Sequence, residues 1–538
     1  MRDHSSGKTE GGLPFRFETI NELVDLACSK YENNTAVKYL HNEKIVDIKY
    51  SKLFIDIGVT VKYLKSASME NKYIVILGDF SYIWLVAFFS SLLSGSIVIP
   101  LNGKSVTAEL LNLNIMSSVD CIIYDLEYKK KAEELSNMKS IKILQMDEII
   151  SCPENYHDIN TRNNCYPNSQ NPALILYTSG TTGHRKAVVL SHENISYNTM
   201  SACLCIPRGS SDSIMPILPV YHALGILSIL MTICIGATLC TSRGIKYFSK
   251  DILCYKPTTM LIVPIIAKSL FRQITQKANS QNAIGFKLAL MICACLQKIG
   301  INIGRIIFRP ILNELGGNVN MIICGGAKLD TVINNMFTSI GICCLQGYGT
   351  TECSPLIAIN SPKHNTPASV GHPIPYVSVK ILDNEILVKG RVVFKGYWNN
   401  EIETEKAFHE GWYKTGDLGY FDRNGNLYVI GRADNLIVLD NGKKIIPEEI
   451  EMLFASSAII SSITVHATKI SDIDVVCAKV YCSDLAAAIN IEAIRGEIEK
   501  EIKNVNKQLD SYKRIKFFEI TTQNPEITAL GKTIRGNP

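Results

Sequence analysis

The sequence predicts a multidomain α/β protein in which helices and largely parallel strands alternate in layers, with a smaller unit at the carboxyl end. Short β-branched runs alternate with helical patterns through most of the chain. The 538 residues, 46% of them hydrophobic, can bury a large core and form more than one structural unit. After about Arg432 the sequence becomes more charged and starts its own alternation.

The first elements follow one another clearly. We expect an amphipathic helix near Ile20–Lys30 and strands over Thr35–Tyr39 and Tyr73–Leu77. An apolar helix over Trp84–Leu93 then precedes a strand over Ser96–Pro100. This alternation favours parallel strands covered by helices.

The segment Ala223–Cys240 is 18 residues long and has no charge, close to the roughly 20 residues of a membrane span. It contains two glycines, follows Pro219 and lacks flanking basic clusters and aromatic belts. We therefore expect a buried helix and strand here. A transmembrane span is not predicted, although peripheral membrane contact is compatible with the sequence.

The carboxyl-terminal unit is long enough to be a domain of its own. It shows two strands and a charged helix, over Ser462–His466, Val475–Tyr481 and Ile489–Gln508. Turn-rich sequence at 422–426 and 431–434 precedes it. The sequence therefore predicts a large domain over 1–432, a small domain over 433–538 and a hinge at about Asp434.

Charge and cysteine content restrict the partners and the compartment. The 55 basic and 50 acidic residues give a net charge of +5 without a long basic run, so nucleic acid is not an expected partner. The 17 cysteines show no C-x-x-C spacing, which favours reduced, mostly buried thiols. The polar amino terminus does not resemble a secretory signal, and we expect a cytoplasmic protein.

The strongest local motif is YTSGTTGHRK, Tyr177–Lys186, which follows the strand-like run Ala173–Leu176. Its glycines, hydroxyl side chains and lysine suit a loop that holds a polyphosphate. It does not fit the Walker A pattern. The alternative interpretation is an ordinary Ser/Thr/Gly surface loop.

Further motifs follow in order. QGYGTTE, Gln346–Glu352, combines an aromatic residue, hydroxyls and a carboxylate, which together suit a base, a phosphate and Mg²⁺. WYKTGDLGYF, Trp412–Phe421, places Asp417 in a tight turn, where it could accept hydrogen bonds from ribose hydroxyls or be only a turn residue. The remaining two are GRADNLIVLDNGKKIIPEEIE, which starts at Gly431, and Gly531-Lys532.

Taken together, the five motifs resemble the adenylate-forming superfamily of acyl-CoA synthetases, luciferases and peptide-synthetase adenylation domains. The resemblance extends from about Phe17 to Arg535. It implies a large amino-terminal region of stacked β-sheets with helices, joined by a hinge to a small mobile α+β domain.

The resemblance also implies an ATP site. The phosphate loop would hold the β- and γ-phosphates through Thr178, Ser179, Gly180, Thr181, Thr182, Gly183 and Lys186. Tyr348 would stack on adenine, in a pocket completed by Gly325, Gly326, Ala327, Gly349 and Thr350. Thr351 would contact the α-phosphate and Glu352 would bind Mg²⁺. Asp417 and Arg432 would bind the ribose and neighbouring phosphate oxygens.

Three more residues receive roles from the resemblance. Asp434 corresponds to the hinge, and Lys532 to the lysine that bridges the substrate carboxylate and the α-phosphate. His222, in LPVYHALG, corresponds to a histidine near the acyl pocket, although a lone histidine is more often a core residue.

The chain departs from the family pattern at several positions. The usual T-G-x-P-K-G reads Thr182-Gly183-His184-Arg185-Lys186-Ala187, without the proline and the last glycine. Asn384-Glu385 replaces a Gly-Glu pair in a connection that is short. The closing motif, Pro525 to Lys532, is one residue longer than usual.

The expected activity is ATP-dependent conversion of a small carboxylic acid to acyl-AMP with release of pyrophosphate, followed by transfer to the thiol of coenzyme A. One alternative acceptor is the phosphopantetheine of an acyl-carrier protein, and another reading is a non-catalytic binding protein. The stretch Lys277–Gly317 resembles bacterial long-chain fatty-acyl synthetases. LPVYHALG lacks the aspartate of amino-acid-activating relatives, so a fatty or aryl acid is expected.

Overall fold

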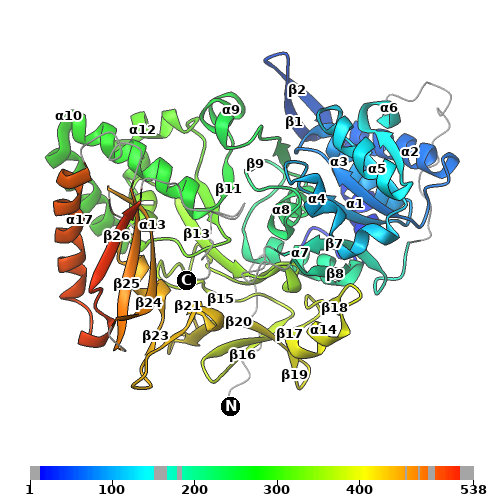
Figure 1. Ribbon diagram of the computed structural model, residues 1–538. Coiled ribbons are helices and arrows are strands. Elements are labelled where there is room, and N and C mark those ends of the chain that lie inside the picture. Colours follow the sequence, from blue (N-terminus) through cyan, green and yellow to red (C-terminus); the bar gives the residue numbers. More distant parts are fainter. Residues whose placement is uncertain are drawn as a thin grey trace.

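The structure is a computed structural model, and it describes residues 12–150, 166–178, 185–454, 457, 459–470, 473–482 and 491–521. Figure 1 shows a large α/β region, blue to yellow, and a small carboxyl-terminal unit, orange to red, at one side of it. The predicted fold class is confirmed. The described strands form three larger sheets in the first region and two small sheets, of two and three strands, in the second.

A seven-stranded sheet carries the predicted phosphate loop. Its order is β18-β8-β7-β4-β3-β5-β6, and its central strands are parallel. The bounds are β3 Tyr73–Leu77, β4 Ile97–Leu101, β5 Cys121–Tyr124, β6 Lys142–Gln145, β7 Pro172–Tyr177, β8 Ala187–Ser191 and β18 Gly396–Tyr397. Since β7 and β8 are antiparallel neighbours, the loop between them starts and ends at the same edge.

A nine-stranded sheet has the order β15-β14-β13-β12-β11-β9-β10-β1-β2. Its bounds are β1 Thr35–His41, β2 Lys44–Lys49, β9 Ser213–Pro216, β10 Thr238–Cys240, β11 Thr259–Ile262, β12 Met321–Cys324, β13 Cys343–Gly349, β14 Leu356–Ile359 and β15 His372–Pro373. The strands from β10 to β13 run parallel. Parallel strands end at one edge, where the residues after β12 and β13 meet.

Helices cover both sheets, and one buried apolar cluster joins the two sheets through α1, α2, α3, α7 and α8. The helices of this region are α1 Ile20–Lys30, α2 Tyr50–Ser66, α3 Tyr82–Leu93, α4 Thr107–Leu111, α5 Lys129–Lys139, α6 Met146–Ile150, α7 His192–Cys205, α8 Ala223–Cys234, α9 Phe248–Tyr255, α10 Pro264–Lys298, α11 Gly304–Ile307, α12 Arg309–Glu314, α13 Thr331–Ser339 and α14 Glu401–Ala407. The segment over Ala223–Cys240 is a buried helix and strand, as predicted.

A five-stranded antiparallel sheet follows. It comprises β16 Val377–Leu382, β17 Glu385–Gly390, β19 Phe408–His409, β20 Trp412–Phe421 and β21 Leu427–Arg432. The short connection noted at Asn384-Glu385 is a two-residue hairpin turn, in which Asp383 and Asn384 have φ values of 50° and 68°. Such left-handed residues suit the twist of a tight hairpin, and asparagine and aspartate tolerate them.

The carboxyl-terminal unit has its own core. It contains β22 Ile437–Val438, β23 Lys444–Ile445, α15 Pro447–Met452, β24 Ile460–Ile470, β25 Ile473–Cys482, α17 Ile491–Asn506 and β26 Phe517–Thr521. Its described part contacts the large region through α10. Lys268 Nζ donates to the Ser461 carbonyl at 3.2 Å, and Arg272 Nη2 donates to the Ser457 carbonyl at 3.1 Å.

The state of the cysteines and the absence of a membrane span were also predicted, and both can be compared with the described residues. Their cysteines are free thiols, of which Cys254 and Cys295 are exposed. Within the same residues, every helix is too short or too polar to cross a bilayer.

Candidate active site

The base of the predicted phosphate loop is closed by backbone. The Thr178 amide donates to the Lys186 carbonyl at 3.1 Å, so both ends of the loop lie side by side. Ser179, Gly180, Thr181, Thr182 and Gly183 lie outside the described residues. The structure therefore places Thr178 and Lys186, and the phosphate-binding role of the loop stays a prediction.

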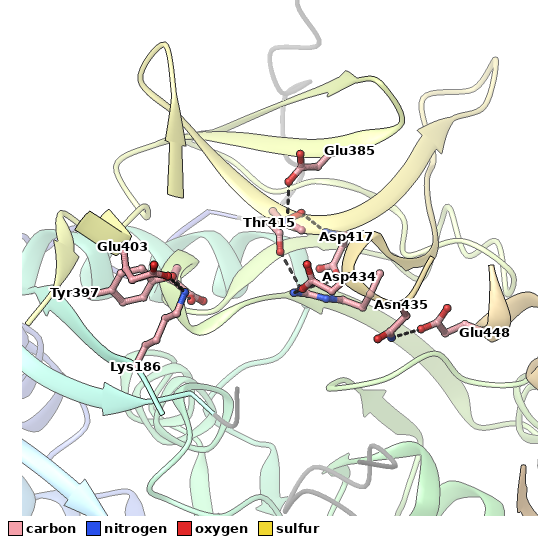
Figure 2. A network of polar contacts seen from close by, with 12 residues as sticks. Lys186, Glu385, Tyr397, Glu403, Thr415, Asp417, Asp434, Asn435 and Glu448 are labelled. Carbon is pink, nitrogen blue, oxygen red and sulfur yellow. Dashed lines mark hydrogen bonds and ion pairs between the residues drawn. The ribbon is translucent and has the colours of Figure 1, made fainter. Parts of the chain in front are cut away.

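Lys186 points toward an acidic helix and an aromatic ring. Its Nζ lies 2.7 Å from Glu403 Oε2 on α14 and 5.0 Å from the centre of the Tyr397 ring (Figure 2). The hydrogen bond from Lys186 and that from Lys406 lower the pKa of Glu403 to about 2. These two contacts orient the Lys186 ammonium group at the end of the loop.

Glu352 lies in η4, Thr351–Cys353, a 3₁₀ helix of one turn that follows shortly after β13. It is buried, and its Oε1 accepts a hydrogen bond of 2.9 Å from the Tyr397 hydroxyl. Burial, then the charge of Glu352, raise the pKa of Tyr397 far above its ordinary value, so this hydroxyl stays a donor. Tyr397 thus connects Glu352 with Lys186.

Tyr348 and Asp417 form the second half of the site. The Tyr348 hydroxyl donates to Asp417 Oδ2 at 2.7 Å, and burial raises the pKa of Tyr348 well above its usual range. The predicted tight turn at Asp417 is wrong, because this residue lies inside the continuous strand β20. The strand is irregular here, because the β17–β20 register shifts between Glu385 and Leu387 and Gly416 has a φ of +69°, which favours glycine. A Cβ there would also lie 2.9 Å from the Arg432 guanidinium.

Arg432 faces Asp417 across the β20–β21 ladder. Its Nη1 donates to Asp417 Oδ1 at 3.1 Å and to the Thr415 carbonyl at 2.9 Å, and its Nη2 donates to Asp434 Oδ2 at 3.0 Å. Burial alone would lower the pKa of Arg432, but the two carboxylates outweigh it and the pKa is raised. One guanidinium therefore joins the predicted ribose ligand, Asp417, to the predicted hinge residue, Asp434.

Glycines allow close approach at two strand ends. A Cβ on Gly325, after β12, would lie 2.8 Å from Leu224 Cδ2 on α8, and Gly326 and Ala327 continue this turn. A Cβ on Gly349, at the end of β13, would lie 1.8 Å from the Pro355 carbonyl oxygen. The segment Thr350–Ser354, which includes Glu352, can fold back only because residue 349 has no side chain.

His222 is the N-cap residue of α8, two residues before Leu224. Its Nε2 is buried and has no hydrogen-bond partner among the described residues. Burial, with a smaller contribution from Arg185, lowers the pKa of His222 to about 4, so the imidazole is neutral near pH 7. A neutral ring with an unsatisfied nitrogen suits contact with a polar ligand atom.

The structure thus brings together most of the described predicted residues in two adjoining clusters. Lys186 meets Glu352 through Tyr397. Tyr348, Asp417, Arg432 and Asp434 are joined by direct hydrogen bonds, and Tyr348 lies four residues before Glu352 in the chain. Lys532 lies outside the described residues. A polar cavity of about 560 Å³ lies at another place, lined by Lys363, His364, Asn365, Thr366, His372, Asn424 and Asn426.

Sequence reasoning missed several supporting residues. Tyr397 and Glu403 orient Lys186, and Thr415 accepts a hydrogen bond from the Asp417 amide at 3.0 Å. Glu385 accepts one from the Gly416 amide, also at 3.0 Å. Of these residues, only Glu385 could have been found from the sequence, because the short Asn384-Glu385 connection departs from the family pattern.

Comparison with known proteins decides the family. The AMP-binding enzyme family matches residues 24–398, and the AMP-binding enzyme C-terminal domain matches 434–537. The chain belongs to the AMP-binding enzyme family. The second match starts at Asp434.

Individual relatives of this AMP-binding enzyme are distant. Long-chain-fatty-acid–CoA ligase FadD15 of Mycobacterium bovis is 31% identical over 314 residues, which are 55% of this chain and 52% of the relative. The chain thus spans about half the length of several curated relatives it matches. Long-chain-fatty-acid–[acyl-carrier-protein] ligase AEE15 of Arabidopsis thaliana is 24% identical over 84% of this chain and 74% of its own length.

Solved structures share the fold. The anthranilate CoA ligase AuaEII in complex with anthranoyl-AMP superposes with a TM-score of 0.79 at 16% identity. The match covers 97% of this chain and 96% of that one. At this identity the likeness concerns the fold alone.

Proposed function

We propose that this AMP-binding enzyme activates a carboxylic acid with ATP, releases pyrophosphate and transfers the acyl group to a phosphopantetheine thiol. The observation that supports it is the joining of Lys186, Tyr397 and Glu352 beside Tyr348 and Asp417. This arrangement offers a cation and a carboxylate for a polyphosphate next to an aromatic ring and a carboxylate for a nucleoside.

The donor set fits Mg²⁺. Among the described residues there is no cluster of three or more His, Cys, Asp or Glu side chains, and Glu352 is a single buried carboxylate. Magnesium bound to a nucleotide takes one or two carboxylates and completes its shell with phosphate and water. When bound, it would supply positive charge to the phosphate oxygens, with Glu352 as its protein ligand.

The first half-reaction needs an electrophilic phosphorus and no general base. A carboxylate oxygen of the acid forms a bond to the α-phosphate, and the bond to the β-phosphate oxygen breaks as pyrophosphate leaves. Negative charge gathers on the phosphate oxygens, where Lys186 would stabilise it. Thr351 would contact the α-phosphate, while Asp417 and Arg432 would fix the ribose.

The second half-reaction exchanges AMP for a thiol. We assign Lys532 to the first half-reaction only, with rotation about Asp434 removing it before the thiol attacks. Lys532→Ala should reduce acid-dependent pyrophosphate exchange by about 100-fold or more, yet leave thioester formation from supplied acyl-AMP within a few fold. Equal losses in both assays would contradict this division.

We propose a fatty acid as the substrate. FadD15 is named for a long-chain fatty acid, and this name supports the class without fixing the chain length. The test is a pyrophosphate-exchange panel of short, long and aromatic acids. Exchange with aromatic acids alone would contradict a fatty acid, and exchange with none would favour a non-catalytic binding protein.

Coenzyme A is the acceptor we favour, and a carrier protein is the second candidate. The second is supported by AEE15, named as an acyl-carrier-protein ligase, which matches a larger share of this chain than FadD15 does. Both acceptors present the same thiol. Mass spectrometry of the product, with coenzyme A and a phosphopantetheinylated carrier protein supplied in parallel, would distinguish them.

A further inference from the structure

The second half of α10 is apolar on two opposite faces. Asn282 leaves the helical conformation, with φ −161° and ψ 86°, and its Oδ1 accepts from the Gly285 amide at 2.9 Å. The helix therefore restarts here with a side-chain cap. From this point Cys293 is buried, and Phe286 and Leu290 pack on the main core.

The other face carries the α10 stripe, Ile284, Leu288, Met291 and Ile292. Their spacing of four, three and one residues places them on one side of a helix. Their exposed fractions are 82%, 52%, 62% and 44%. Ile306, on the adjoining α11, is 77% exposed. Since isolated exposed apolar residues are common but a helical stripe of them is not, this face is built to be covered.

The charge around the stripe indicates what covers it. Residues 252–313 contain eight lysines and arginines and neither aspartate nor glutamate. Lys268, Arg272 and Arg305 donate to backbone carbonyls and Lys277 pairs with Glu314, so these four do not belong to the rim. Lys287, one helical position before Leu288, is exposed, and so is Arg309 at the start of α12. A second copy of the chain would bring the same positive rim against itself. An anionic lipid surface matches both the apolar stripe and the positive rim.

We propose that the α10 stripe and its basic rim dock this protein on anionic membranes. The helix would lie in the plane of the lipid headgroups, with the four apolar side chains inserted and Lys287 and Arg309 contacting phosphates. Figure 1 places α10 at an outer edge of the molecule, where a flat surface can reach it. The proposal is independent of the proposed ligase activity.

Vesicle sedimentation tests it. The full chain is mixed with vesicles of equal parts phosphatidylglycerol and phosphatidylcholine, and separately with phosphatidylcholine alone. We expect binding to the anionic vesicles, at least tenfold weaker binding to the neutral ones, and a clear loss in high salt. If the wild-type protein binds neither kind of vesicle, the proposal is refuted.

Two double variants make the test specific. Leu288→Glu with Met291→Glu should reduce binding to anionic vesicles at least tenfold. The control, Val106→Glu with Leu126→Glu, changes side chains of similar exposure, 64% and 57%, on other elements and should bind as wild type does. Circular dichroism and melting temperature check that both variants fold.

The outcomes are distinct. Equal binding by the stripe variant and the control would overturn the proposal. A concentration-dependent dimer in sedimentation velocity, dispersed by the stripe variant, would also overturn it and assign the face to a second copy.

Discussion

Lys186 meets two groups that sequence spacing does not connect with it. Glu403 and Tyr397 lie more than 200 residues further along the chain, yet they fix the ammonium group at the mouth of the loop. Their roles could not be predicted, because a glutamate and a tyrosine in a polar segment have no local pattern. The lysine itself was found because it ends a recognisable motif.

Replacing Lys186 should therefore affect ATP more than it affects folding. Lys186→Met should lower kcat/KM for ATP in pyrophosphate exchange about 100-fold, the range for losing one electrostatic stabiliser. Lys406→Met is the matched control, since Lys406 contacts the same Glu403 carboxylate at 2.9 Å but its side chain is 68% exposed. The control should stay within twofold. Similar losses in both variants would instead implicate the packing of α14.

Asp417 can be tested through the sugar it is proposed to bind. Wild-type enzyme should prefer ATP over 2′-deoxyATP by about tenfold or more, the worth of one hydrogen bond to a charged group. Asp417→Ala should bring this preference close to one, while Tyr348→Phe should retain it because the carboxylate remains. A preference that survives in Asp417→Ala would exclude the ribose role.

At the scale of elements, strong hydrophobic periodicity predicted helices and strands correctly, whereas the glycine-rich segment around Asp417 was predicted wrongly. The helix Ile20–Lys30 and the strand Tyr73–Leu77 have the predicted bounds. Asp417 was expected in a tight turn between two strand-like runs, but its pairing with Arg432 on β21 holds it in a strand. Tertiary pairing overrides a local turn signal in such a segment.

Helix α7 gives a pH prediction. Its first residue, His192, is buried, and burial lowers its pKa to about 4. Between about pH 6.5 and 4 the unfolded chain binds a proton that the folded chain does not, so stability falls as pH falls, by about 3 kcal/mol in total.

His192→Asn should remove this acid sensitivity. At pH 7 the variant should have a lower melting temperature than wild type, because packing is lost. The difference between the two melting temperatures should decrease toward pH 4.5. Melting temperatures across this range test it, with His364→Asn, a change at an exposed histidine, as the control. A gap that stays constant with pH would contradict the buried neutral state.

At the scale of the whole molecule, the two regions meet through side chains on one side and backbone on the other. Lys268 and Arg272 on α10 donate to carbonyls just before and at the start of β24. Sequence reasoning placed the boundary near Asp434 from composition. It could not find this contact, because backbone carbonyls carry no residue identity.

This contact should favour one arrangement of the two regions. Burial and the neighbouring Arg272 lower the pKa of Lys268 to about 8, so the contact weakens as the lysine loses its proton above that pH. Lys268→Met with Arg272→Met should slow one half-reaction about tenfold and spare the other. Pyrophosphate exchange and thioester formation from acyl-AMP, measured separately, test this. Unchanged rates in both would show that the contact has no part in turnover.

The two hydrogen-bonded carboxylates of Arg432 couple the proposed nucleotide site to the domain boundary. The same guanidinium donates to Asp417 and Asp434. A ligand whose phosphate oxygens attract this guanidinium would therefore weaken its hydrogen bond to Asp434. Thermodynamic linkage makes this reciprocal. A substitution at Asp434 should therefore alter nucleotide affinity without touching the nucleotide.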